Sequence, residues 1–250
     1  MSKNSKVSLD DEVQGLLSQK NKLADTAGIF APPKKEKIQM GFIRKVYGIL
    51  TLQIIITFSF AVLSLNSPAL AAFMMTNSWL VILSLVLSLV ALYSLVCFVD
   101  FQRRVPYNYL MLLLFTVCEA YIVGYFCLGF PANNVYEAAF MACALCVGLT
   151  IYACLTKTDF TLWGGFLFLA GLTFVIGGAI LLIFRTPLIM VIFDCIGLIL
   201  FGFYLIYDTQ LIIGTKAAVY SVDDYIMATM NLYLDIINIF IDILSLVGRK

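Results

Sequence analysis

Residues 225–247, YIMATMNLYLDIINIFIDILSLV, form the most informative segment of this chain. Four polar residues interrupt its apolar run, at spacings of four, three and four: Asn231, Asp235, Asn238 and Asp242. At about 100° per residue in an α-helix, these side chains fall on one narrow stripe. The segment has 23 residues, which is enough to cross a bilayer. Carboxylic acids inside a membrane helix need a buried or wet partner, and the rest of the chain must supply it.

The composition is that of a membrane protein with several spans. The 250 residues are 62% hydrophobic and 12% charged, with a mean hydropathy of +0.99, whereas soluble domains average about 45–50% apolar and about 25% charged residues. Residues 1–45 hold nine of the sixteen Lys and Arg residues, and the remainder holds seven bases and ten acids. This excess of acids favours a cation pathway or proton chemistry, and we expect no nucleic-acid binding.

Histidine is absent, which removes the usual group that titrates near neutral pH and the commonest zinc ligand. Any response to pH must therefore come from carboxylates. All seven cysteines lie in apolar runs, and we interpret them as small buried residues rather than disulfides or metal ligands. Without histidine, the Ser/His/Asp and Cys/His catalytic sets cannot form. We expect no enzyme activity and no cofactor.

The chain divides into a polar segment, residues 1–40, and an apolar domain, residues 41–250. The polar segment predicts a disordered cytosolic tail. The apolar domain predicts an all-α, polytopic membrane fold. Its seven spans are expected at about 46–65, 79–99, 109–129, 138–155, 163–184, 188–213 and 225–247.

The distribution of Lys and Arg predicts that the N-terminus is cytosolic. In that orientation the cytosolic loops hold Arg103, Arg104, Lys157 and Lys216. The opposite side holds Arg185 and, if the last segment crosses fully, Arg249 and Lys250. The terminal pair fits that side poorly. A re-entrant last segment, which would return the C-terminus to the cytosol, therefore stays open as an alternative.

Acidic residues also lie inside other spans, with no Lys or Arg in mid-span to neutralise them: Glu119 in the third span, and Asp194 and Asp208 in the sixth. Asp194 and Asp208 are fourteen residues apart, so they share a helical face but lie about 21 Å apart along the axis. Asp208 lies near the cytosolic end of its span and Asp235 about halfway along the last. A helical hairpin could bring these two together.

Two carboxyls that share a desolvated site do not readily both ionise, so one keeps a proton. Such a pair is a proton switch that needs no histidine. When both ionise, they repel each other and offer hard oxygen ligands to Ca²⁺, with neutral oxygens from Asn231 and Asn238 on the same stripe. The alternative is that the acids stay protonated and only hold helices together. For Glu119, Asp194 and Asp242, this structural role is as well supported as a functional one.

Several tyrosines could donate hydrogen bonds to these acids: Tyr204, Tyr207, Tyr225 and Tyr233. Aromatic residues at span edges are more often interfacial anchors.

A set of motifs resembles the transmembrane Bax-inhibitor-motif family, and its lifeguard branch most closely. The motifs are FIRKVY at 42–47, LQ at 52–53, Glu119, KTDF at 157–160, YDTQ at 207–210 and NLYLDIIN at 231–238. The similarity covers about residues 40–248. It implies a seven-helix bundle with the last helix central, a pH-sensitive passive Ca²⁺ leak across intracellular membranes, and inhibition of apoptosis.

In that resemblance, Asp208 and Asp235 match the paired aspartates of the family. The protonated pair closes the pore on the cytosolic side, and deprotonation loosens it and lets the acids hold permeating Ca²⁺ transiently. The resemblance implies a Golgi or endoplasmic reticulum membrane, with the plasma membrane as an alternative. Ca²⁺, H⁺, the lipid bilayer and cell-death regulators or receptors are the implied partners.

The sequence also departs from the family pattern. The last loop lacks the basic, His-containing sequence and the Ser-Pro-Glu-Glu-Tyr run of many lifeguard proteins, and reads SVDDY at 221–225. Asp194 and Asp242 fall where neutral residues are expected. Some relatives place an arginine in the second span near the aspartates, whereas Arg103 and Arg104 in the following loop are the nearest candidates here.

Two other functions fit the residues. The chain could be a non-channel regulator that binds receptors or apoptosis proteins, with the acids serving as structure. It could also be an H⁺-coupled transporter, since the sixth and seventh spans are rich in Asp. The sequence leaves the organelle, the oligomeric state and the physiological partner open.

Overall fold

The computed structural model describes residues 14–16, 18–19, 35–98, 103–181, 183, 186–214 and 220–249. The chain forms two compact units, Met1–Ile38 and Gln39–Lys250. In the first unit the described residues are helical. Most of the predicted disordered tail lies outside the described residues, as do Arg185, Lys216 and Lys250, so the tail and its boundary at residue 40 stay predictions.

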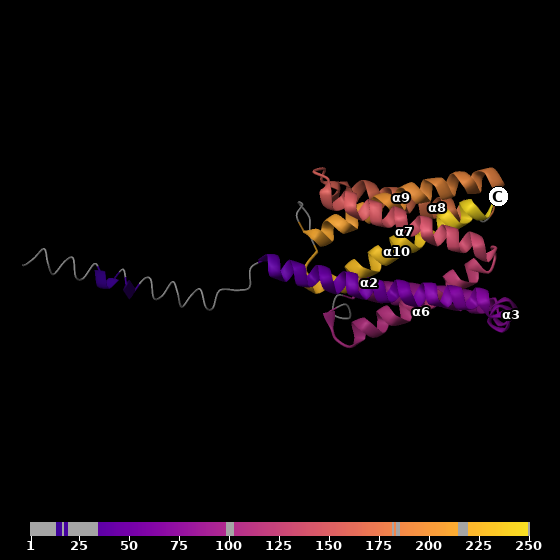
Figure 1. The fold of residues 1–250 in the computed structure, drawn as a ribbon, viewed down its shortest axis with the longest axis horizontal. Coiled ribbons are helices and arrows are strands. Elements are labelled where there is room, and N and C mark those ends of the chain that lie inside the picture. Colours follow the sequence, from indigo (N-terminus) through magenta and orange to yellow (C-terminus); the bar gives the residue numbers. More distant parts are fainter. Residues whose placement is uncertain are drawn as a thin grey trace, which may run out of the picture. The chain divides into compact units, whose positions relative to one another are not determined.

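The described residues form helices and no strands (Figure 1). In chain order the elements are α2 (Lys35–Asn66), α3 (Pro68–Thr76), α4 (Trp79–Cys97), α6 (Tyr107–Cys127), α7 (Ala132–Leu155), η1 (Phe160–Trp163), α8 (Gly164–Leu181), α9 (Pro187–Ile213), η2 (Val222–Asp224) and α10 (Tyr225–Gly248). Seven of them are long and apolar enough to cross a membrane: α2, α4, α6, α7, α8, α9 and α10. The predicted all-α, seven-span fold is confirmed.

The helix boundaries add detail to the predicted spans. The predicted linker after the first span contains the short helix α3, which begins at Pro68 and is capped by Ser67. A proline suits the first turn of a helix because its missing N–H would have no partner there. The last segment, α10, is one continuous helix of 24 residues. A re-entrant segment needs a break, so the shape of α10 favours a complete crossing.

The end of α9 is defined by Gly214, which has a φ of 70° and donates its N–H to the carbonyl of Gln210. This left-handed conformation stops the helix, and glycine adopts it without a steric cost. The side-chain amide of Gln39 on α2 donates to the carbonyl of Ile212. The chain therefore leaves α9 at a fixed point, one short loop before α10.

Helix α10 is the central element of the unit Gln39–Lys250. Figure 1 shows it (yellow) between α7, α8 and α9 on one side and α2 and α6 on the other. Of its most apolar part 61% is buried, against 6% for α8. The Tyr233 ring packs edge-on against Phe115 of α6, with centroids 5.9 Å apart, and its hydroxyl lies 2.8 Å from Thr57 Oγ1 of α2. The predicted central position of the last helix is confirmed.

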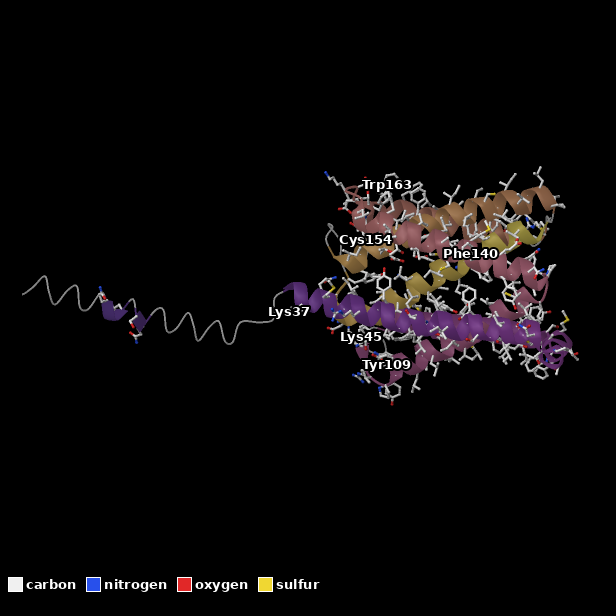
Figure 2. All side chains as sticks on the ribbon, in the orientation of Figure 1. Lys37, Lys45, Tyr109, Phe140, Cys154 and Trp163 are labelled. Atoms are coloured by element: carbon white, nitrogen blue, oxygen red, sulfur yellow. The ribbon has the colours of Figure 1, made fainter. Side chains whose placement is uncertain are left out.

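The outer surface of the bundle is apolar. Phe140 and Trp163 project from it (Figure 2), as do Ile82 of α4 and Val175 of α8. The hydrocarbon of a bilayer accepts such side chains, provided that the backbone polar groups are satisfied within helices. The protein is therefore a multi-pass membrane protein.

Each end of the bundle contains an Arg–Asp ion pair. At one, the Lys45 end, Lys45 Nζ lies 3.2 Å from the centroid of the Tyr225 ring and 5.9 Å from that of Tyr109 (Figure 2). The Arg103 guanidinium pairs there with Asp224, at 3.0 Å. The other, the Arg249 end, is where α10 finishes. Cation–π and ionic contacts thus secure the start of α10 to α2 and α6.

Candidate functional site

The site is built where α9 and α10 pack against each other in an antiparallel hairpin. Asp208 on α9 and Asp235 on α10 are both buried, with 4% and 5% of their surface exposed. Their carboxyls lie within hydrogen-bonding reach of each other. A hydrogen bond between two carboxyls needs a proton on one of them. The structure therefore brings the two predicted acids together in a geometry that a shared proton stabilises, and it does so without breaking either helix.

Two polar side chains hold this pair. The Tyr220 hydroxyl donates to Asp208 Oδ1, at 3.3 Å, and accepts from the Asn231 amide, at 2.8 Å. Asn231 is also a hydrogen-bond partner of Asp208. Burial, followed by the negative charge of Asp208, raises the pKa of the Tyr220 phenol above its ordinary value. Tyr220 therefore stays a donor at every physiological pH.

A cavity of about 450 Å³ lies between α8, α9 and α10 and reaches both acids. We call it the α8–α10 cavity. Its apolar wall includes Phe168, Leu172 and Val175 of α8. Its polar residues are Tyr204, Tyr207, Asp208, Asn231, Asp235 and Asn238. Asp235 Oδ2 meets no N–H or O–H donor among the described residues. The pair thus lies beside a cavity that has an apolar wall and a polar wall.

The other predicted site residues lie elsewhere or bond differently. Asn238 lines the cavity, but its amide donates to the carbonyl of Leu234 in its own helix, at 2.8 Å. Glu119 on α6 is half-buried and hydrogen-bonds to Ser88 of α4. Asp242 lies with Asp194 at the Arg249 end, away from the Asp208–Asp235 pair. The polar stripe on α10 therefore contributes to two separate sites, the α8–α10 cavity and the Arg249 end of the bundle.

Of the tyrosines named from the sequence, three have other partners. Tyr204 donates to the carbonyl of Leu167, Tyr225 accepts from Asn108, and Tyr233 bonds to Thr57. Tyr207 lines the cavity. The tyrosine that bonds to an acid is Tyr220, which sequence reasoning missed. It lies between the sixth and seventh predicted spans, where no periodic pattern shows which way a side chain points.

Within the described ranges, no Lys or Arg forms an ion pair with Asp208 or Asp235. Arg103, the nearest candidate for an arginine latch, pairs with Asp224 instead. Across the described ranges, no group of three or more His, Cys, Asp or Glu side chains could hold a metal ion. Two carboxylates are few ligands for Ca²⁺, which takes six to eight oxygens. This geometry suits a passing cation better than a resident one.

The sequence pattern of the family described as "Inhibitor of apoptosis-promoting Bax1" matches residues 39–250. The chain belongs to this family. It is 34% identical to Bax inhibitor 1 of Schizosaccharomyces pombe over 214 residues, covering 85% of this chain and 78% of that protein. It is also 34% identical to Protein LIFEGUARD 4 of Arabidopsis thaliana over 214 residues, or 84% and 85% of the two chains.

The chain is also similar to a human protein. Protein lifeguard 3 of Homo sapiens is 30% identical over 218 residues, which cover 86% of this chain and 70% of that protein. The match begins after the polar N-terminal segment and includes all seven candidate spans. The resemblance to the Bax-inhibitor-motif and lifeguard proteins is therefore confirmed, and the chain is a multi-pass membrane protein of an apoptosis-inhibitor family.

The Tyr220 contacts lead to a first prediction. Tyr220→Phe removes the donor to Asp208 and the acceptor for Asn231, and should lower the free energy of unfolding by about 1–2 kcal/mol. A folded-state pKa above the ordinary value of about 10 means that Tyr220 supports the fold fully below that pH and loses this contribution as the pH rises further. The loss in the variant should therefore be constant from about pH 6 to 9 in thermal unfolding.

Tyr93→Phe is the matched control, because Tyr93 is exposed on α4. If both variants unfold at the same temperature, the Tyr220 hydroxyl contributes nothing to the site.

Proposed function

We propose that this Bax inhibitor family protein is a pH-sensitive passive Ca²⁺ leak channel that modulates stored Ca²⁺ and thereby inhibits apoptosis. The observation that carries the proposal is the close pairing of the buried Asp208 and Asp235 carboxyls beside the α8–α10 cavity. Ionisable residues within membrane spans are expensive, and by default they mark a functional site. Here two of them share one desolvated place.

The proposed gate is the proton between these carboxyls. With it, α9 and α10 are joined by a hydrogen bond, and the pair carries at most one negative charge. Loss of the proton leaves two like charges in contact, which repel each other and push the helices apart. The same step exposes hard oxygen ligands that suit Ca²⁺. The protonated pair thus closes the pathway, and the deprotonated pair opens it and binds the ion.

The proposal includes an orientation and a location. Cytosolic loops of membrane proteins carry an excess of Lys and Arg. This rule favours a cytosolic Lys45 end, which has the basic residues Lys45, Arg103, Arg104 and Lys157. The gate then lies on the cytosolic half of the bundle, since Asp208 is close to the end of α9. We infer an intracellular membrane of the endoplasmic reticulum or Golgi, and a transport role without enzyme activity.

The test is Ca²⁺ flux into proteoliposomes that contain the purified protein, measured at a series of pH values. Flux through the wild type should rise with pH, by up to about tenfold per unit, which is the limit for one titrating proton. Asp208→Asn/Asp235→Asn keeps a neutral, hydrogen-bonding pair that cannot lose a proton. Its flux should stay low and should not respond to pH.

Asp223→Asn is the control, because it removes an exposed carboxylate at the same end of the bundle. Its pH response should match that of the wild type. A double-Asn variant with wild-type flux would show that the pair is no gate. Absence of flux from every variant would favour the alternative, a regulator that acts by binding receptors or cell-death proteins and uses the acids only to join helices.

A further inference from the structure

A second pair of buried acids lies at the Arg249 end of the same two helices. Asp194 on α9 has 9% of its surface exposed and Asp242 on α10 has 7%. Arg249 Nη2 lies 2.8 Å from Asp194 Oδ2 and donates to Ser245 Oγ at 2.9 Å. Ser245 is itself a hydrogen-bond partner of Asp194. A guanidinium therefore occupies one side of this second pair.

Asp242 is the member of the pair that has no ion-pair partner among the described residues. Its Oδ2 is buried and meets no N–H or O–H donor in the described part of the chain. The carboxyl packs against Gly197 of α9, where a Cβ would lie 2.5 Å from Oδ2. A buried acceptor without a donor costs about 1–3 kcal/mol. The backbone of α9 thus leaves room for an acid whose Oδ2 no described residue satisfies.

This second pair is continuous with the first. Phe174 of α8 lines the α8–α10 cavity, and its ring would also meet a Cβ at Gly197, at 2.8 Å. Asp235 and Asp242 are seven residues apart on α10, which places them on one face about 10.5 Å apart along the axis. Acidic oxygens therefore follow the α9–α10 interface from the cavity to the Arg249 end.

We propose that Asp194, Asp242 and Ser245 form a second cation site, which takes a divalent cation such as Ca²⁺ and which Arg249 occupies in competition with it. The role of this site rests on the proposed leak function. In that function, the site lies at the opposite end of the ion pathway from the Asp208–Asp235 pair. The ligand class follows from the donors, which are carboxylate and hydroxyl oxygens.

Charge explains why the guanidinium and the cation exclude each other. Two carboxylates in a desolvated place stabilise one Arg or one divalent cation, and a cation beside the guanidinium would be repelled. Two carboxylates and one hydroxyl supply at most five oxygens, so water must complete the shell of Ca²⁺. We expect weak binding, with a Kd of about 10⁻⁴–10⁻³ M.

The test separates this site from the first pair by using the full chain with Asp208→Asn/Asp235→Asn as the background. Equilibrium dialysis with radioactive Ca²⁺ should find one saturable site there. Adding Arg249→Gln should lower its Kd by about tenfold, since the competing charge is gone. Adding Asp242→Asn or Asp194→Asn should abolish saturable binding.

Glu137→Gln is the matched control, because it removes an exposed carboxylate from the first turns of α7. It should leave the Kd unchanged. Unfolding temperatures identify any variant that fails to fold. If one of Asp194→Asn and Asp242→Asn does not fold, the other decides the test. The proposal is overturned if binding survives both Asp substitutions or if Arg249→Gln leaves the Kd unaltered.

Flux and binding can fail separately. A wild-type protein without Ca²⁺ flux contradicts the proposed function, whereas a saturable site in the double-Asn background still supports the second site. Conversely, flux that depends on Asp208 and Asp235, with no binding in that background, leaves the leak channel and removes the second site.

Discussion

Tyr233→Ala should lower the free energy of unfolding by about 3–5 kcal/mol, which is the usual cost of deleting a large buried aromatic side chain. Tyr233 is fully buried in α10, the helix around which the others pack. Its ring contacts Phe115 of α6, and its hydroxyl bonds to Thr57 of α2. A cavity at this point therefore loosens three helices at once.

The measurement is thermal unfolding in detergent, followed by the reaction of a thiol probe with cysteines that only unfolding exposes, chiefly Cys127. Tyr233→Phe keeps the ring and removes only the Thr57 hydrogen bond, so it should cost about 1 kcal/mol. Equal unfolding temperatures for the Ala and Phe variants would show that the ring does not stabilise the centre of the bundle.

Gly197→Val should prevent α9 and α10 from packing as they do, and most of the protein should fail to fold. A Cβ at Gly197 would lie 2.5 Å from Asp242 Oδ2 and 2.8 Å from the Phe174 ring. Small residues at helix contacts let backbones approach closely inside a membrane, where no hydrophobic force between helices compensates for poor packing. Overpacking costs about 1–3 kcal/mol, and displacing a buried acid adds to it.

Gly148→Val is the control for this variant, because a Cβ at Gly148 on α7 meets nothing within 4 Å. Both substitutions place valine in a helix interior, so any difference comes from tertiary contacts. The yield of monodisperse protein in size-exclusion chromatography should fall for Gly197→Val and stay near wild type for Gly148→Val. A normal yield for both would mean that the helix pair tolerates separation at this point.

The sequence predicts much of this architecture because membrane spans have a strong signal. Long apolar runs locate the seven helices, and the polar stripe on 225–247 predicts that the acids of the last helix need a buried or wet partner. The central position of that helix comes from the family resemblance. Asp208 and Asp235 lie at different depths in two consecutive spans, and the sequence predicts only that a helical hairpin could bring them together. The resemblance to a known family added the same pair independently, through the YDTQ and NLYLDIIN motifs.

The contacts that sequence reasoning missed depend on loops and on the reach of long side chains. Tyr220 bonds to Asp208 because the chain turns back between α9 and α10, and periodicity says nothing about such a turn. Arg249 reaches Asp194, which is 55 positions away in the sequence, from the end of its helix. Asn238 was placed correctly on the stripe, yet its amide bonds within α10.

Helix α8 supplies an outward-facing wall of the α8–α10 cavity. Phe168 and Val175 line the α8–α10 cavity on one side and are largely exposed on the other. The acyl chains thus press directly on the wall of the space that contains Asp208 and Asp235. In the proposed leak channel, membrane thickness and tension should therefore act on the gate, and the Ca²⁺ flux should differ between bilayers of short and long lipids.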